Sequence, residues 1–265
     1  MGLRKAPEEH SWKDNDDKRS LHQRIAGEYR AKILKGDLEP GAKLPSTTEM
    51  CALYGASSTA VQNAMRALKD EGLVVGHAGS STKVREHRMR VMKPAQYFAP
   101  AEPGEPYRWI AEAQKQGMTA ESELLEVGEV VPPPSVAKAL GIAADGTAVL
   151  RRQLLKLNGE PAELVENYYP VEIARGTAIE RAEKVKGGVP TLLAELGFPS
   201  RRATDQVSAE TPTFEEGAYL KMPTGELPVL RTFRVVRSDD DRVIQVDALT
   251  KAGHLYKLEY ELPIS

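Results

Sequence analysis

The chain has 265 residues, of which 41% are hydrophobic, and this length and composition favour a globular protein of two domains. Because the chain has a single cysteine, Cys51, it can form neither an internal disulfide framework nor a thiolate metal cluster. No apolar run approaches the roughly 18 residues that a membrane span needs, so we expect the protein in the cytoplasm. The formal net charge of −2 is unevenly distributed, because residues 18–90 hold 13 Lys and Arg against 7 Asp and Glu, whereas residues 91–265 hold 20 against 26.

Three helices are expected in the basic segment. From Leu21 to Lys35 the apolar side chains recur every four residues, which is the spacing of one helical stripe. Ser46 and Glu49 have the spacing of a capping box and predict a second helix over Thr47–Tyr54. A third helix is expected over residues 57–71 after a tight turn that contains glycine. Two short helices joined in this way predict a helix-turn-helix.

The sequence after the third helix predicts a β wing. Two short strands are expected at residues 73–75 and 82–84, and the flexible tip GHAGSS joins them. These elements complete a winged helix-turn-helix over residues 18–88. The charged residues 1–17 are expected to form a disordered tail, and the proline-containing residues 89–106, which show no sustained period, are expected to form a linker.

The remainder of the chain, residues 107–265, predicts an α+β domain with a mainly antiparallel sheet, because hairpins alternate with helices. The expected strands are ESELLEVGEVV, the two strands of AVLRRQLLKLNGEPAELVENYYP, RRATDQVSAE, VLRTFRVVRS and RVIQVDALTK. The expected helices are PPSVAKALGI, PTLLAELGF and TFEEGAYLKM. Hairpin turns are expected at Asn158-Gly159 and at residues 239–241. The segment HLYKLEYEL is expected either to add a strand to this sheet or to extend its last strand.

The third helix has one apolar and one polar face. Its apolar side chains, which are expected to pack on its own domain, are Val61, Ala64, Met65 and Leu68. On the polar face, Gln and Asn can pair bidentately with adenine in the major groove, Arg can pair with guanine, and hydroxyl groups suit a phosphate oxygen. A solvated helix face would explain the same residues, but the wing, the turn and the positive charge together favour double-stranded DNA as the partner. The predicted DNA-binding residues are Ser46, Thr47, Thr48, Ser57, Ser58, Thr59, Gln62, Asn63, Arg66, His77, Ser80 and Lys83.

Several marks of this first domain occur together. They are Ile33 to Gly36, Pro40-Gly41, Leu44-Pro45-Ser46, Glu49, Val61, Ala64, Leu68, Glu71-Gly72-Leu73 and the glycines of the wing. With these marks the segment resembles the winged-helix domain of GntR-type bacterial transcription regulators. That family usually carries arginine where this chain has Thr48, Ser58 and Gln62, and glutamate where it has Asn63. The resemblance therefore implies a different operator and a shallower salt dependence of binding. His77 occupies a position where the family commonly has a basic residue. It could be a neutral imidazole, a hydrogen-bond donor in the minor groove or a plain turn residue.

Three segments of the second domain carry another resemblance. They are ALGIAADGTAVLRRQLLKLNGEPAELVENYYP, VPTLLAELGF and LPVLRTFRVV with its following strands. The domain resembles the UTRA effector-binding domain of the HutC subfamily, which has the chorismate lyase fold. The resemblance implies an effector held by an arginine before the NGEP turn and an acid after it, and so suggests Arg152 and Glu166. The further lining that it suggests is Tyr168, Gln245, Asp247 and Tyr256. Each of these could instead be a surface ion pair or a sheet-packing residue. The family commonly has a second arginine where this chain has Gln153, so the resemblance does not imply that the effector is a sugar phosphate.

The sequence thus predicts a homodimeric, ligand-responsive transcriptional regulator, with repression implied only by the resemblance. A copy-control or structural DNA-binding protein whose second domain only dimerises is the alternative, and a small-molecule enzyme tethered to DNA is a third reading. His254 and the carboxylates of Glu163 and Asp247 show no catalytic spacing, and the patterns HExxH and GxSxG are absent. We therefore expect no catalysis, cofactor or bound metal, and no contact with a membrane.

Overall fold

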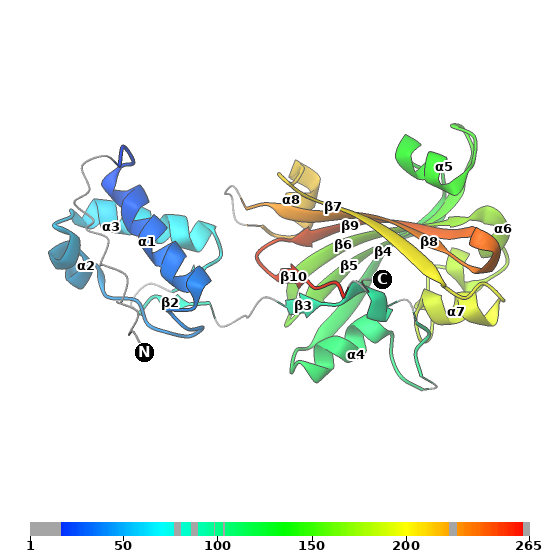
Figure 1. Ribbon diagram of the computed structural model, residues 1–265, viewed down its shortest axis with the longest axis horizontal. Coiled ribbons are helices and arrows are strands. Elements are labelled where there is room, and N and C mark those ends of the chain that lie inside the picture. The colour runs from blue at the N-terminus through cyan, green and yellow to red at the C-terminus, as the bar shows by residue number, and fades with distance from the viewer. Residues whose placement is uncertain are drawn as a thin grey trace, which may run out of the picture. The chain divides into compact units, whose positions relative to one another are not determined.

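The computed structural model describes residues 17–76, 81–85, 90–97, 99–102, 104–222 and 227–261. These residues form two compact units, a smaller one over 17–85 and a larger one over 90–261. The smaller unit consists of helices with a short hairpin, and the larger one is a twisted sheet with helices on both faces (Figure 1). Within the described part of the chain, no helix combines the length and the apolarity that crossing a bilayer requires.

The smaller unit contains the elements that the sequence predicts for it. They are α1 (Leu21–Lys35), α2 (Thr47–Tyr54), α3 (Ser58–Asp70), β1 (Val74–Val75) and β2 (Lys83–Val84). The two strands pair antiparallel, with Val74 opposite Val84. The expected winged helix-turn-helix is therefore confirmed, apart from the tip of the wing, which lies outside the described residues.

Side-chain caps fix the turn between α2 and α3. The capping box before α2 is present, because the Ser46 amide donates to the Glu49 carboxylate at 2.7 Å and the Glu49 amide donates to Ser46 Oγ at 3.3 Å. Gly55 ends α2 in the left-handed conformation, with φ of 60°, which glycine adopts at little cost. The Ala60 amide then donates to Ser57 Oγ at 3.2 Å and caps the start of α3, so that only three residues, 55–57, separate the two helices.

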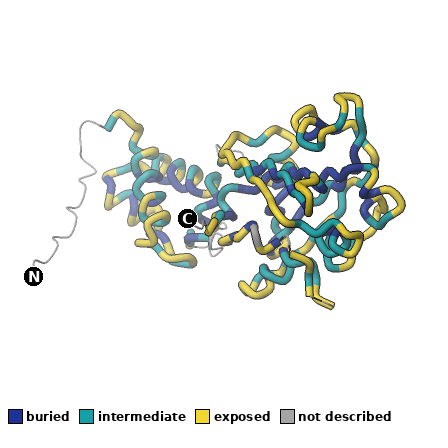
Figure 2. The backbone as a smooth tube through the Cα atoms, turned by 45° about the vertical axis from the view of Figure 1, so that its right-hand side comes forward, coloured by how far each residue is buried: buried dark blue, intermediate teal, exposed yellow. Residues whose placement is uncertain are grey.

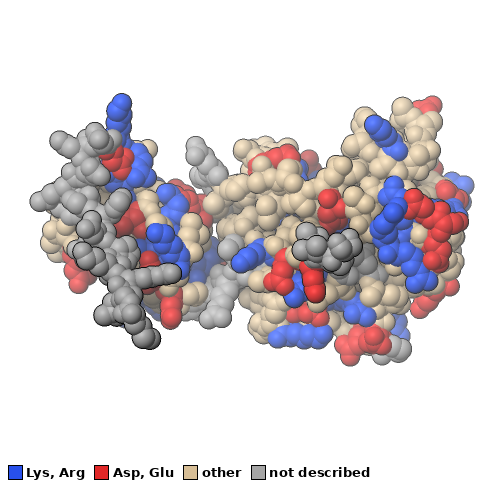
Figure 3. Space-filling view, viewed as in Figure 1, with Lys and Arg blue, Asp and Glu red and all other residues tan. Residues whose placement is uncertain are grey.

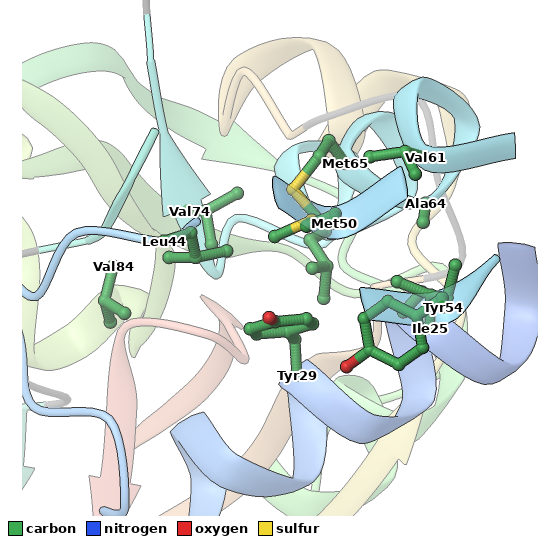
Figure 4. Packing of buried hydrophobic residues seen from close by; sticks show 12 residues of the cluster. Ile25, Tyr29, Leu44, Met50, Tyr54, Val61, Ala64, Met65, Val74 and Val84 are labelled. Carbon is green, nitrogen blue, oxygen red and sulfur yellow. The ribbon is translucent and has the colours of Figure 1, made fainter. Parts of the chain in front are cut away.

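A single apolar core holds the smaller unit together (Figure 4). Its labelled members are Ile25, Tyr29, Leu44, Met50, Tyr54, Val61, Ala64, Met65, Val74 and Val84. The rings of Tyr29 and Tyr54 meet edge to face with their centroids 6.4 Å apart, which joins α1 to α2. The Arg30 guanidinium donates from Nε to the Glu71 carboxylate at 2.6 Å, and so ties α1 to the C-terminal end of α3. Core packing and this ion pair together set the orientation of α3.

The larger unit is built on one antiparallel sheet of six strands, in the order β4-β5-β6-β9-β8-β7. The strands are β4 (Ala120–Val130), β5 (Ala148–Leu157), β6 (Glu160–Pro170), β7 (Arg202–Glu210), β8 (Val229–Arg237) and β9 (Val243–Ala252). The predicted turn between β5 and β6 is confirmed, because Asn158 and Gly159 both have positive φ, as a tight hairpin turn requires. In Figure 2 the buried stretches include the central strands β5, β6 and β9, whereas β7 at the edge is largely exposed.

Helices cover both faces of this sheet. The helices of the larger unit are α4 (Arg108–Lys115), α5 (Pro134–Leu140), α6 (Val171–Ala174), α7 (Val189–Glu195) and α8 (Phe214–Tyr219), with 3-10 turns η1 (Pro94–Tyr97), η2 (Ala178–Glu180) and η3 (Asp239–Asp241). Helix α4 packs Trp109 against Leu155 and Val165 on one face of the sheet, and α5 packs Val136 on the other face. The α+β fold class is confirmed. Helix α4 was not among the expected elements, although its buried pair Trp109 and Ala113 has helical spacing.

The C-terminal segment departs from the sequence expectation. Instead of joining or extending the main sheet, β10 (Tyr256–Leu258) pairs in parallel with β3 (Arg90–Met92) in a separate two-stranded sheet. The chain leaves β9 at Gly253, where a Cβ atom would lie only 2.4 Å from the carbonyl oxygen of Pro228. The partner β3 lies within the residues 89–106 that were expected to form a linker, and its three residues are too few to show a strand period. The domain boundaries themselves remain predictions.

Loss of a core side chain in the smaller unit should destabilise that unit. We expect Leu68→Ala to lower its free energy of unfolding by about 2–5 kcal/mol, because Leu68 is fully buried and the truncation leaves a cavity. Hydrogen exchange of the α1 and α3 amides in the full chain measures the change. Leu53, which is 56% exposed on α2, is the control, and Leu53→Ala should change the free energy by less than about 1 kcal/mol. Equal effects of the two substitutions would contradict this description of the core.

Candidate DNA-binding and effector sites

Helix α3 separates its side chains as its sequence predicts. Val61, Ala64 and Leu68 are fully buried and Met65 nearly so, which confirms the apolar face. The predicted DNA-binding residues that are exposed are Ser46, Thr47, Thr48, Ser57, Ser58, Thr59, Gln62 and Arg66, while Asn63 and Lys83 are half-buried. His77 and Ser80 lie outside the described residues.

The polar side chains on the exposed face of α3 are free of recorded contacts with the rest of the described chain. Within the described residues, no hydrogen bond or ion pair is recorded for the side chains of Gln62 and Arg66, one helical turn apart. The first turn of α3 contains no acidic side chain, so its unpaired amides and the positive end of the helix dipole are open to an anion. A helix anchored on one side and offering amide, guanidinium and hydroxyl groups on the other has the chemistry that duplex DNA requires.

The larger unit contains a cavity of about 340 Å³ on the face of the sheet that carries α4 and α7. Its floor is formed by alternate residues of neighbouring strands, because side chains that share a register position point to the same face. One polar row crosses the sheet at that level, and its members in order are Arg151, Asn167, Asp247, Arg234 and Asp205. The first four of these line the cavity.

Asp247 lies at the centre of this row and is 2% exposed. One of its oxygens, Oδ1, accepts hydrogen bonds from Asn167 Nδ2 at 2.7 Å and from Gln245 Nε2 at 2.6 Å. Burial raises the pKa of the Asp247 carboxyl, and the nearby Arg234 guanidinium and the two amides act in the opposite direction. The floor of the cavity thus holds a buried carboxyl group that is fixed in orientation by two amide side chains.

The Arg151 side chain holds a loop that forms part of the cavity wall. Its Nη1 atom donates to the carbonyl oxygens of Ile179 and Arg181, each at 2.8 Å, and to that of Ala178 at 3.3 Å, while Nη2 donates to the carbonyl of Glu183 at 2.7 Å. These carbonyls belong to η2 and the loop after it, whose next residues, 184–188, line the cavity. The guanidinium therefore holds that loop against the sheet.

The other two cations of the floor are paired with acids. Lys251 Nζ lies 2.9 Å from the Glu163 carboxylate, and both side chains are almost fully buried. Arg234 donates to both oxygens of Asp205, at 2.6 and 2.7 Å, and the Tyr260 hydroxyl donates to the same carboxylate at 3.0 Å. Elsewhere on this unit acidic and basic side chains lie next to each other on the surface in Figure 3, but such exposed pairs are weak. The buried pairs are the ones that determine the electrostatics of the cavity.

The six predicted effector residues do not line one site. Gln245 and Asp247 line the cavity, and their role in effector binding stays a prediction. Arg152 and Glu166 point to the opposite face, where they form an ion pair of 3.2 Å, and Arg152 also pairs with Glu215 at 2.8 Å. The expectation that these two groups share a site with Asp247 is therefore wrong. The reason is strand alternation: Glu166 is level with Ala248 on β9, one residue beyond Asp247.

The two predicted tyrosines also lie away from the cavity lining. Tyr168 is buried on the opposite face of the sheet with Val136 and Val246, and Tyr256 is buried in the apolar cluster that contains Trp109. The cavity residues that sequence reasoning missed are Arg151, Asn167, Glu163, Lys251 and Arg234. The signal that could have found two of them is the occurrence of Glu163 and Asn167, four residues apart on one face of the mostly apolar strand β6.

Comparison with known proteins gives an independent result. The model for bacterial regulatory proteins of the gntR family matches residues 21–84, and the model for the UTRA domain matches residues 115–257, which is more than half of the chain. An HTH-type transcriptional regulator of Streptomyces coelicolor is 26% identical over 247 residues, which cover 91% of each chain. The HTH-type transcriptional regulator GgaR of Escherichia coli is 21% identical over 240 residues, which cover 91% of this chain and 90% of GgaR.

Solved structures support the same fold. PhnF from Mycobacterium smegmatis superimposes with a TM-score of 0.57 at 18% identity, covering 91% of this chain and all of PhnF. The fold and the two sites define a class of protein, a DNA-binding transcriptional regulator that carries an effector-binding domain. The chain belongs to the gntR family with a UTRA domain, which is the architecture of the HutC subfamily.

Breaking the buried ion pair should destabilise the larger unit. We expect Lys251→Met to cost about 3–5 kcal/mol, because Glu163 would be left charged and buried without its cation. Chemical unfolding followed by Trp109 fluorescence, in a Trp12→Phe background, measures the loss. The double variant Glu163→Leu/Lys251→Met should recover most of it, and failure to recover would contradict the uncompensated Glu163 charge as the cause of the loss.

Proposed function

We propose that the protein is a homodimeric repressor that reads a near-palindromic operator with its two α3 helices and responds to an effector bound in the cavity of the larger unit. The observation that carries this proposal is the exposed face of α3 around Gln62 and Arg66, whose side chains have no recorded partner among the described residues, on a helix whose other face is fixed in a core. Two such helices in a dimer would enter successive major grooves. Because such a regulator acts on the chromosome, the cytoplasm is part of the proposal.

The residues of the DNA interface divide into two proposed roles. Gln62, Asn63 and Arg66 would contact base edges, since they project from the middle of α3. The hydroxyl groups at the starts of α2 and α3, together with Lys83 of the wing, would contact phosphates. We also propose that His77 and Ser80, in the segment that joins the two strands of the wing, contact the DNA. Neutral groups in the phosphate-contacting positions support a shallow dependence of binding on salt.

Substitution of the central arginine tests the DNA interface. We expect Arg66→Ala to weaken binding to the operator by about 1–3 kcal/mol, because a bidentate contact to guanine would be lost. Genomic footprinting first identifies the operator, and fluorescence anisotropy at fixed salt then measures affinity for it and for random DNA. Lys35→Ala, which removes an exposed positive charge at the end of α1, is the control and should have a small effect on both. An equal loss on random and operator DNA would assign Arg66 to the phosphate backbone.

The effector site that we propose is the cavity above Asp247. Its buried polar row, its loop held by Arg151 and its aromatic wall support selective binding of a small molecule. Arg152 and Glu166 are not part of this proposal, because each already has a partner on the other face of the sheet. Binding would shift the population between conformations that fit the operator and conformations that do not, which requires unequal affinity for the two.

A metabolite screen distinguishes a sensory domain from one that only dimerises. We expect at least one metabolite to raise the melting temperature of the protein and to lower its affinity for the operator. The stabilisation should be lost in Asp247→Ala and retained in Arg152→Ala. A broad screen without a stabilising compound would favour dimerisation alone, and the reverse pattern of the two variants would place the effector on the opposite face.

Two further measurements test the remaining parts of the proposal. Sedimentation velocity should give a dimer at micromolar concentration, and a monomer that still binds the full operator would contradict the proposed arrangement. Binding without catalysis is also proposed, so incubation with the stabilising metabolite should return it unchanged.

A further inference from the structure

The cavity holds a carboxylate that has no ion-pair partner in the described part of the chain. Asp247 accepts hydrogen bonds from two neutral amides, both on Oδ1, and no salt bridge is recorded for it among the described residues. The nearby Arg234 guanidinium attracts this carboxylate, but it donates hydrogen bonds to Asp205. Burial of a carboxylate without an ion-pair partner of its own is costly, because water no longer solvates the charge. A ligand that brings a positive charge to this carboxylate would remove that cost.

The cations around the floor are already engaged. The Arg151 guanidinium donates to four backbone carbonyls, Lys251 is paired with Glu163, and Arg234 is bidentate to Asp205. An anionic ligand could recruit one of them only by breaking these bonds, and it would then lie near Asp247, which has the same sign of charge. Lys184 and Lys186 also line the cavity, but both are exposed, so their charges are screened by water.

Aromatic side chains belong to the lining of the same cavity. Tyr107, Trp109 and Tyr169 are part of its lining, and they come from the start of α4 and from β6. Burial raises the pKa values of Tyr107 and Tyr169; the charges of Glu163 and then Asp247 add to the shift at Tyr107, and the charge of Asp247 adds to it at Tyr169. The faces of aromatic rings attract cations, and the attraction increases when water is excluded.

We propose that the effector carries a protonated amine or another small organic cation, which binds the Asp247 carboxylate between the aromatic side chains of the cavity. This inference rests on the proposed function, because it assumes that the effector occupies this cavity. A neutral polyol can donate a hydrogen bond to Asp247, but it leaves the buried charge uncompensated. A phosphate or carboxylate group would meet like charge at the same position.

Three probes of similar size test the proposal on the full-length protein. Benzylamine and benzyl alcohol have nearly the same shape and differ in carrying a positive charge or none, while benzoate, of similar size, carries a negative charge on the same ring. Isothermal titration calorimetry should show benzylamine binding about tenfold more tightly than benzyl alcohol, with benzoate weakest. Quenching of Trp109 fluorescence in a Trp12→Phe background should report the same order, which locates the probe at the cavity.

Two carboxylate variants identify the group responsible. Asp247→Asn keeps the shape of the side chain and removes its charge, so the ratio of benzylamine to benzyl alcohol affinity should fall to about one. Glu215→Gln removes an exposed carboxylate on the opposite face of the sheet and should keep the tenfold ratio. If circular dichroism shows that Asp247→Asn does not fold, the order of affinity of the wild-type protein for the three probes still tests whether a positive charge is preferred.

The outcomes separate this inference from the proposed function. Benzoate binding as tightly as benzylamine, or equal binding of the amine and the alcohol, would overturn the cationic effector but leave the cavity as a ligand site. Retention of the tenfold ratio in Asp247→Asn would also overturn it. Binding of none of the three probes would contradict both the cationic effector and the cavity as the effector site, while the test of Arg66 on DNA would be unaffected.

Discussion

The alternation of side chains along paired antiparallel strands is the constraint on which the larger unit depends. Hydrogen bonding between strands places Arg151, Asn167, Asp247 and Arg234 level with one another, so their side chains must share a face of the sheet. Helices α4 and α7 cover that face and enclose the polar row. The chemistry of the cavity therefore follows from the register, and a shift of one residue on any strand would exchange its polar side chains for those of the opposite face.

The smaller unit follows the same logic with a helical period. Helix α3 buries Val61 and Leu68 and thereby exposes Gln62 and Arg66, because neighbouring residues on a helix lie about 100° apart. The caps at Ser46 and Ser57 and the left-handed Gly55 fix where α2 ends and α3 begins. In both units the packing of apolar side chains thus fixes the direction in which the polar side chains of the proposed site point.

Local signals explain how much could be predicted from the sequence. The capping box, the glycine stops and the Asn158-Gly159 turn each act within a few residues, so the sequence alone predicted α1, α2 and α3, the hairpin of β5 and β6, and the exposed face of α3, whereas it missed α4. The effector site depends on pairing between strands that are distant in sequence. Arg152 and Glu166 are indeed opposite each other, but only the register of β6 against β9 reveals that Asp247 lies on the other face. Strand β3 is too short to show a period, and its partner β10 is more than 160 residues away.

The Arg151 guanidinium makes the wall of the cavity depend on a single side chain. Because the carbonyls of residues 178, 179, 181 and 183 converge on it, a rotation of Arg151 away from the loop would break all of these hydrogen bonds together. The shape that a ligand meets is thereby tied to the position of one guanidinium group.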